Sequence, residues 1–148
     1  MENKNIVLKG SFVGTLRHAD GSVEVRRKDN IILNVGFDFV ADAIGNGSAR
    51  PAVMSYTAVG TGTTATNAEQ TALVAELARK AATYSHTTGT KVFTFSTYFG
   101  KGEATGAITE AGICNASGGG IFLDRVTFNV INKDADDEFT TNFQFTLS

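Results

Sequence analysis

Few side chains of this 148-residue chain have the type and spacing needed for catalysis or metal binding. Each of the two histidines, His18 and His86, lies beside a predicted turn, so both are expected at the surface. No residue near either histidine in sequence completes a catalytic triad or dyad, although the sequence leaves their spatial neighbours open. The single cysteine, Cys114, lies in an apolar run and is interpreted as a small buried hydrophobic residue. A disulfide within the chain and a Cys/His zinc site are therefore excluded.

The carboxylates suggest two further hypotheses, and we favour neither. The acidic run 134–138 offers oxygen ligands suited to calcium, but it lacks the spacing and the internal glycine of an EF-hand loop. We therefore expect a solvated turn and no metal ion, with these secondary calcium candidates: Asp134, Asp136 and Asp137. Glu103 and Glu110 could form the carboxylate pair of a glycan hydrolase, but their sequence spacing does not establish such a pair. We assign no catalytic residue and predict that the protein is not an enzyme.

The segment Gly60–Thr64, GTGTT, invites comparison with loops that bind phosphate groups. It lacks the lysine of a Walker motif and the third glycine of a dinucleotide fingerprint, so we expect no nucleotide and no other cofactor. We interpret it as a tight turn that leads into a helix over about residues 67–80. Thr66 and Glu69 have the spacing of a capping box, and Leu73 and Leu77 would lie on the helix face turned to the core.

Composition limits the class of protein. No apolar run approaches the roughly 20 residues of a membrane-spanning helix, and the first residues lack the apolar stretch of a secretory signal. A net charge of −2 does not favour a nucleic-acid-binding role. We expect a soluble chain made in the cytoplasm, with neither nucleic acid nor membrane as partner. Sixteen glycines against one proline, together with eleven phenylalanines, are typical of many short strands joined by tight turns.

Residues 107–130 form the segment around which we expect the rest of the chain to be organised. Two runs of strand character are joined there by Ser117 and three glycines, which predicts a β-hairpin. In the second run, apolar residues recur with the two-residue period of a strand, and only Asp124 interrupts that face. The residues on this face are Phe122, Val126, Phe128 and Val130.

Other segments supply the remaining strands and one more helix. Hairpins are predicted for 5–16 with 22–28 and for 81–86 with 91–99, a buried strand for 53–59, and a final strand for 139–147. Asn34 can cap a helix over 35–44. Its recurring apolar residues are Phe37, Val40, Ala41 and Ile44.

These elements predict a single all-β domain over residues 1–148. We expect an antiparallel β-sandwich, of jelly-roll or Ig-like topology, with two short helices and with residues 1–5 as an extended arm. The predicted core includes Phe93, Phe95, Val126, Phe128, Phe143 and Phe145.

An ordered set of motifs over roughly residues 30–132 resembles small structural proteins of tailed bacteriophages, either decoration or tail-associated. The set comprises NVGFDFVADAIGNG, SYTAVGTGTTAT, NAEQTALVAELARK, ITEAGICN and IFLDRVTFNVINK. The resemblance implies a virion component without catalysis. It does not settle which part of the virion contains the protein.

Our first hypothesis is a capsid decoration (cement) protein that binds the outer surface of the phage head and stabilises it. Its partners would be the major capsid protein and further copies of itself in a dimer or trimer. The alternative is a tail, baseplate or fibre-associated module, including a receptor- or carbohydrate-binding adhesin domain. The sequence shows no heptads and no β-helix repeats, which argues against a self-contained fibre. Contact residues are expected in free segments: Asn3, Lys4, Asn5, Thr61, Thr63, Thr64, Lys101 and Glu103.

Overall fold

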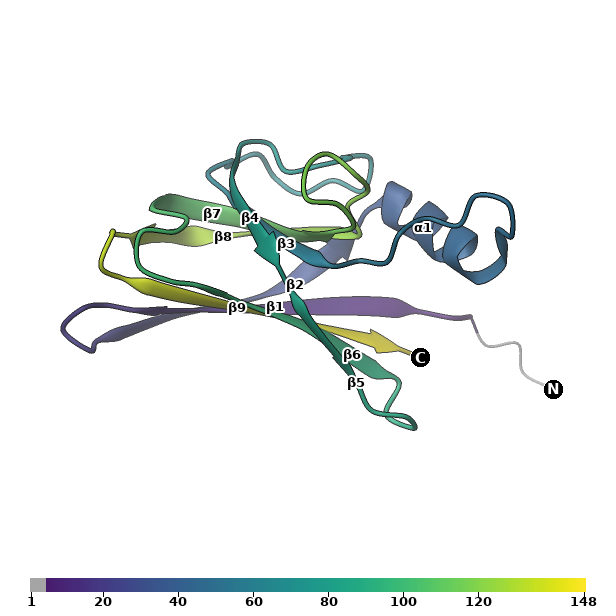
Figure 1. Ribbon diagram of the computed structural model, residues 1–148, viewed down its shortest axis with the longest axis horizontal. Coiled ribbons are helices and arrows are strands. Elements are labelled where there is room, and N and C mark those ends of the chain that lie inside the picture. The colour runs from purple at the N-terminus through teal and green to yellow at the C-terminus, as the bar shows by residue number, and fades with distance from the viewer. Residues whose placement is uncertain (1–4) are drawn as a thin grey trace.

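The computed structural model describes residues 5–148 and shows antiparallel β-strands with one helix in this range (Figure 1). The predicted all-β class is confirmed, whereas only one of the two predicted helices is present. No helix in the described part of the chain is long and apolar enough to cross a membrane. The elements are β1 (Leu8–Arg17), β2 (Val23–Ile32), α1 (Asn34–Gly45), β3 (Tyr56–Gly60), β4 (Glu76–Ala81), β5 (Thr83–His86), β6 (Val92–Phe99), β7 (Gly106–Cys114), β8 (Asp124–Lys133) and β9 (Glu138–Leu147).

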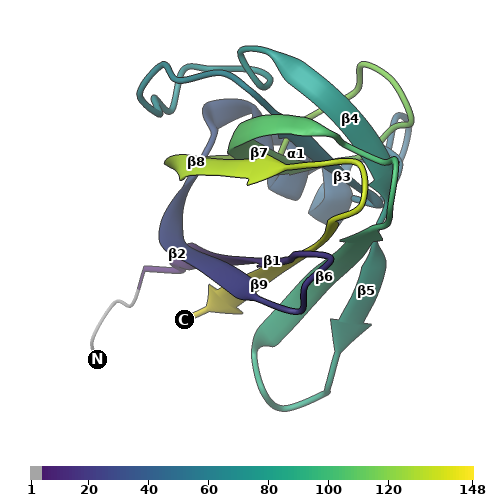
Figure 2. The same cartoon turned by 90° about the vertical axis from the view of Figure 1, so that its left-hand side faces the viewer.

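The nine strands form one nearly closed sheet in the order β4-β3-β7-β8-β2-β1-β9-β6-β5. β4 and β5 stand at the two ends of this order, yet only Ala82 separates them in the chain. β4 pairs with β3 and β5 pairs with β6, so this continuous segment brings the two ends of the sheet together. The hydroxyl of Thr97 on β6 donates to that of Thr57 on β3 at 2.9 Å. Figure 2 shows β7 and β8 on the opposite side of the fold from β1 and β9.

The core lies between these two sides and consists largely of aromatic side chains. On β9, Phe139, Thr141, Phe143 and Phe145 are buried and the residues between them, at every second position, face outward, as the alternation predicts. The rings of Phe12 on β1 and Phe128 on β8 stack with centroids 4.9 Å apart. All six residues predicted for the core belong to the main hydrophobic cluster, two of them partly buried.

The predicted hairpins are present. β1 pairs with β2 through a turn in which Gly21 has φ +88°, and β5 pairs with β6 through a turn in which Gly89 has φ +93°. Both values lie in the region that glycine adopts at little cost. β7 pairs with β8, which confirms the hairpin expected to organise the chain. The predicted strand 53–59 is shorter than expected, because β3 begins at Tyr56, but neighbours pair with it on both sides.

Helix α1 forms where the sequence predicts it but buries a different face. The N-cap is Leu33 and no side chain caps the helix, so the capping role predicted for Asn34 is wrong. The backbone N–H of Asn34 donates instead to the carbonyl of Ala68 at 2.8 Å. Gly36 is the buried residue of the helix, because α1 packs too closely on the Leu123 carbonyl to accept a side chain there. Three of the four residues of the predicted apolar face are therefore exposed: Phe37, Ala41 and Ile44.

The second predicted helix, over about residues 67–80, is wrong. Residues 66–75 are irregular, and Glu76–Ala81 is strand β4. The capping box does not form, because the Glu69 N–H donates to the side chain of Asn67 at 2.9 Å. Tertiary contacts override helix propensity here, since β3 supplies a ladder partner and a buried carboxylate, Glu110, accepts the N–H groups of residues 74 and 75. Leu73 is buried as predicted, but Leu77 is exposed.

An irregularity on β8 changes which of its residues face the core. Ile108 stands opposite Ile131 and Glu110 opposite Thr127, so residues 128–130 of β8 face the single residue 109 of β7. The regular alternation of side chains along β8 is interrupted across this irregularity. The buried positions pass from Val126 to Ile131, and Val130, predicted on the core face, is exposed.

Candidate functional site

An apolar groove of about 590 Å³ is lined by residues of α1, β5 and β6 and by Leu147 near the C-terminus. Figure 1 shows α1 and the C-terminus toward the same end of the fold. Phe39 and Val40 of α1 form one side of the groove, and Tyr84 of β5 and Phe93 of β6 form another. The segment before β3 contributes Val53 and Met54. The side chains that line this groove are largely apolar, which is typical of a site for apolar groups rather than for ions.

Several apolar side chains at this end are exposed to solvent. Val53 is 76% exposed, Tyr84 is 57% exposed, and Phe37, in a neighbouring hollow beside β1, is 51% exposed. The Tyr84 ring lies against Phe95, with centroids 5.4 Å apart, which fixes its position beside the groove. Exposed apolar side chains that gather on one surface are characteristic of protein-binding surfaces. We call Val53, Tyr84 and the groove between them the apolar end.

The residues predicted to make contacts do not lie on one surface. Asn5 is exposed near the apolar end, where Val7 and Ser148 exchange backbone hydrogen bonds. Lys101 and Glu103 are exposed at the other end of β1 and β9, where Gly102 donates to the carbonyl of residue 135. The ten residues of β1 separate these ends by roughly 30 Å. A third region, beside β7, holds Thr61, Thr63 and Thr64, all exposed. Asn3 and Lys4 lie outside the described residues.

Glu110 on β7 has a fully buried carboxylate that organises the loop after β3. It accepts backbone N–H groups from Gly62, from Val74 at 2.7 Å and from Ala75 at 3.1 Å. The Nε of buried Arg125 lies 3.3 Å from it. Internal donors thus occupy both oxygens, and they account for the path of the chain over 60–75 without invoking a phosphate ligand.

The other member of the carboxylate pair considered for a hydrolase, Glu103, has a different environment. Its carboxylate is exposed and accepts the N–H of Gly100 at 2.7 Å and the ammonium of Lys80 at 2.8 Å. The Lys80 hydrogen bond is the main reason that the pKa of Glu103 is lowered. Because Glu103 is paired at the surface while Glu110 is bonded inside the fold, their arrangement is explained by structural contacts.

Asp124 and Cys114 are buried ionisable groups. The Asp124 carboxylate accepts the backbone N–H of Ile113 at 2.9 Å and the side-chain amide of Asn30 at 2.6 Å, and burial raises its pKa to about 7. In the sequence Asp124 is the one polar residue on an otherwise apolar strand face. That interruption is the only feature of the sequence that could have indicated a buried carboxylate there. Cys114 is buried as expected, and burial raises its pKa to about 11.

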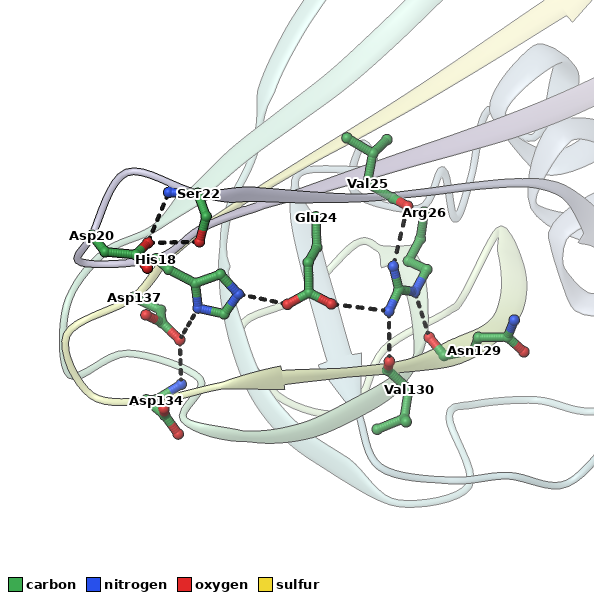
Figure 3. A network of polar contacts seen from close by, with 10 residues as sticks. All are labelled: His18, Asp20, Ser22, Glu24, Val25, Arg26, Asn129, Val130, Asp134 and Asp137. Carbon is green, nitrogen blue, oxygen red and sulfur yellow. Dashed lines mark hydrogen bonds and ion pairs between the residues drawn. The ribbon is translucent and has the colours of Figure 1, made fainter.

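Figure 3 shows that His18 lies between two carboxylates that the sequence does not bring together. Its Nε2 is 2.6 Å from Glu24 and its Nδ1 is 3.2 Å from Asp137, and the side chain is 28% exposed. The Glu24 hydrogen bond, reinforced by Asp137, raises the pKa of His18. His86 is exposed as predicted, with Nδ1 2.7 Å from the carbonyl of Val92.

The acidic run uses one of its carboxylates in local structure. Asp137 is nearly buried, accepts the N–H of Asp134 at 2.9 Å and contacts His18, and the Asp134 hydrogen bond is the main reason that its pKa is lowered. Asp134 and Asp136 are exposed. Within residues 5–148, no group of three or more histidine, cysteine, aspartate or glutamate side chains is placed to hold a metal ion.

Comparison of the chain with protein-family models, with curated proteins and with solved structures gives no match. A functional assignment therefore depends on the motif resemblance and on the surfaces of the described residues. Among these surfaces, the apolar end has the features of a binding site for another protein.

Proposed function

We propose that this protein is a non-enzymatic structural component of a bacteriophage virion, a capsid decoration protein that binds the outer surface of the head and stabilises it. The motif resemblance over roughly residues 30–132 supports a virion component. The observation that carries the proposal is the apolar end, where exposed Val53 and Tyr84 flank an apolar groove on a domain with an extensive aromatic core.

The fold suits such a role. We further propose that the nearly closed sheet is a β-sandwich of jelly-roll or Ig-like topology, with β3, β4, β7 and β8 in one layer and the other strands in the second. The arrangement in Figure 2 supports two layers. A sheet whose core strands are long and paired on both sides presents its end surface with little loss of conformational entropy on binding, which favours affinity.

The free energy of one contact at the apolar end is modest, so stable attachment to the head requires several such contacts. Burying an exposed apolar side chain of the size of valine contributes about 1.5–3 kcal/mol, so one apolar end provides a modest contact. A dimer or trimer on a symmetric shell presents several such ends together, and subunits that share an oligomer rebind at high effective concentration. We therefore propose a homo-oligomer whose partner is the major capsid protein.

The direct test adds purified protein to heads that were produced without it. We expect the protein to co-sediment with the heads and to increase their survival after heating or osmotic shock. Val53→Ser should weaken co-sedimentation because it removes apolar area from the apolar end. Val23→Ser is the matched control, since Val23 is also exposed but lies on β2 next to the β1–β2 turn.

Two outcomes would contradict the decoration proposal. One is failure of the folded protein to bind heads or to protect them. The other is immunogold labelling confined to tails, which would favour the tail, baseplate or adhesin alternative. Equal binding by Val53→Ser and Val23→Ser would leave a decoration role but would show that a surface other than the apolar end makes the contact.

A further inference from the structure

The wall of the fold has a weak seam between β2 and β8. These strands pair through only two residue pairs, Ile31 with Arg125 and Ile32 with Asp124. Beyond these pairs β8 forms its bulge, and ladder hydrogen bonds no longer join it to β2. A side chain spans the seam instead (Figure 3). The guanidinium of Arg26 on β2 donates to the carbonyl of Asn129 at 3.0 Å and to that of Val130 at 2.9 Å.

Glu24 and His18 extend this side-chain contact to the end of the fold. One carboxylate oxygen of Glu24 lies 3.3 Å from Nη2 of Arg26, and the other lies 2.6 Å from Nε2 of His18. The second ring nitrogen of His18 lies 3.2 Å from Asp137 in the β8–β9 turn. The chain of contacts therefore joins the β1–β2 hairpin to β8 at Arg26 and to the β8–β9 turn at His18.

The protonation state of His18 decides whether both of its contacts can exist. An imidazolium has two N–H donors, one for each carboxylate. A neutral imidazole has one N–H, so its other nitrogen would direct a lone pair at a carboxylate oxygen. We propose that His18, Glu24 and Asp137 form a pH-operated latch: protonated His18 holds the β1–β2 turn against the β8–β9 turn, and deprotonated His18 releases it. The proposal does not depend on the virion assignment.

The charged groups around His18 support this direction. From its own hairpin it faces Glu24 and Asp20, whose carboxylate accepts from Ser22, and from the β8–β9 turn it faces Asp137. The Glu24 hydrogen bond is the largest cause of the raised His18 pKa. Cations are more remote, with Arg26 beyond Glu24 and Lys133 interacting with Asp137.

The direction of each pKa shift sets the pH range of the latch. Because the folded protein raises the pKa of His18, the stabilisation is fully present below about pH 6.5, the value for an unfolded chain. It is lost as pH rises through the higher folded value. Glu24 and Asp137 have lowered pKa values, so they stay ionised to more acidic pH. The latch should therefore be closed in mildly acidic solution and open in alkaline solution.

The test combines a histidine titration with hydrogen exchange on the full chain. By NMR, His18 should titrate above the ordinary histidine value with both ring nitrogens protonated at low pH. Glu24→Gln should lower the His18 pKa, because it removes the carboxylate that lies 2.6 Å from Nε2 of His18. The Asp134 amide and amides 19–22 should lose protection several-fold, after correction for intrinsic rates, as pH rises through the His18 pKa. In His18→Asn the same amides should have low protection that no longer follows this transition.

Controls separate the latch from two other groups that can respond to pH. Asp124 also titrates near pH 7 but lies at the far end of β8, and Lys133 interacts with Asp137, so Asp124→Asn and Lys133→Met should both retain the local transition. A His18 pKa at or below the ordinary value overturns the proposal. So does a transition that persists in His18→Asn or disappears in Lys133→Met. If His18→Asn does not fold, the wild-type titration and Glu24→Gln still decide the question.

Discussion

Replacing Glu110 by glutamine tests whether a buried carboxylate determines the path of the chain over residues 60–75. In the native fold, one Glu110 oxygen accepts from Val74 and Arg125, and the other accepts from Gly62 and Ala75. Glutamine has nearly the same shape but replaces one acceptor oxygen by an NH₂ donor. Whichever way the amide turns, two native donors lose their acceptor.

The expected loss of stability is large because nothing at this position is exposed. Glu110 and Arg125 both have fully buried side chains, so the substitution leaves the Arg125 charge without its counter-charge. Breaking a buried ion pair by removing one partner costs about 3–5 kcal/mol. The double variant Glu110→Gln/Arg125→Met should be more stable than Glu110→Gln alone, because it removes the uncompensated charge.

Urea unfolding at pH 7, followed by circular dichroism, measures this effect. With a slope of about 2 kcal/mol per molar urea, the predicted loss shifts the midpoint by about 2 M. Glu103→Gln is the matched control, because it also removes a carboxylate that accepts a backbone N–H and pairs with a cation, but at the surface. Equal shifts for the two variants would refute the reasoning, since the effect would then not depend on burial.

Three further predictions concern the core and its ionisable groups. Phe143→Ala should cost about 3–5 kcal/mol, because the ring is fully buried and lies 5.0 Å from that of Phe12; an unchanged urea midpoint would contradict this. Cys114 should resist alkylation in the folded protein at pH 8 and react rapidly in denaturant, since it is buried and its pKa is about 11. Asp124 keeps its proton in the folded state up to about pH 7, so stability should fall as pH rises from about 4 to 7. Denaturation across this range should show a smaller slope for Asp124→Asn, and an identical slope would contradict the assignment.

Local sequence patterns predicted those strands whose partners are adjacent in the chain. The turns at Gly21 and Gly89 need positive φ, and alternating residues on both sides of each turn fix the register. The strand 139–147 was predicted equally well, because polar residues on its solvent-facing side alternate with largely aromatic residues on its core side. Each of these signals lies within a short window of sequence, so it can be recognised without knowledge of the rest of the fold.

Residues 67–80 show why the same reasoning failed elsewhere. Their alanines and leucines, with Glu76 and Arg79 three apart, match a helix, and that ion pair does form, at 2.6 Å, but on a strand. Arg79 also donates to the carbonyls of Ala116 and Gly119 in the β7–β8 connection. These partners are 37 and 40 residues away in sequence. A local pattern cannot anticipate such contacts, and their combined energy exceeds a difference in propensity of a few tenths of a kcal/mol per residue.

The candidate sites were not predicted from the sequence for a related reason. His18 and Asp137 are 119 positions apart (137 − 18), and only the pairing of β1 with β9 brings their neighbours Arg17 and Glu138 into register. The apolar end depends likewise on α1 presenting Gly36 to the core, which a pattern of apolar spacing cannot show. Such contacts follow from the order of the strands in the sheet, which the local sequence patterns did not predict.

The seam between β2 and β8 links the fold to its proposed pH response. A bulge interrupts the β8 ladder and leaves carbonyls that would otherwise lack partners, which is costly in a wall that covers a core. Arg26 satisfies two of these carbonyls, but its position depends on Glu24, which also binds His18. Backbone hydrogen bonds between two strands do not change in strength between pH 5 and pH 8, because the peptide groups do not titrate there. Contacts between an imidazolium and carboxylates do change in this range, because the imidazolium loses its proton. The pH dependence therefore follows from where the ladder is interrupted.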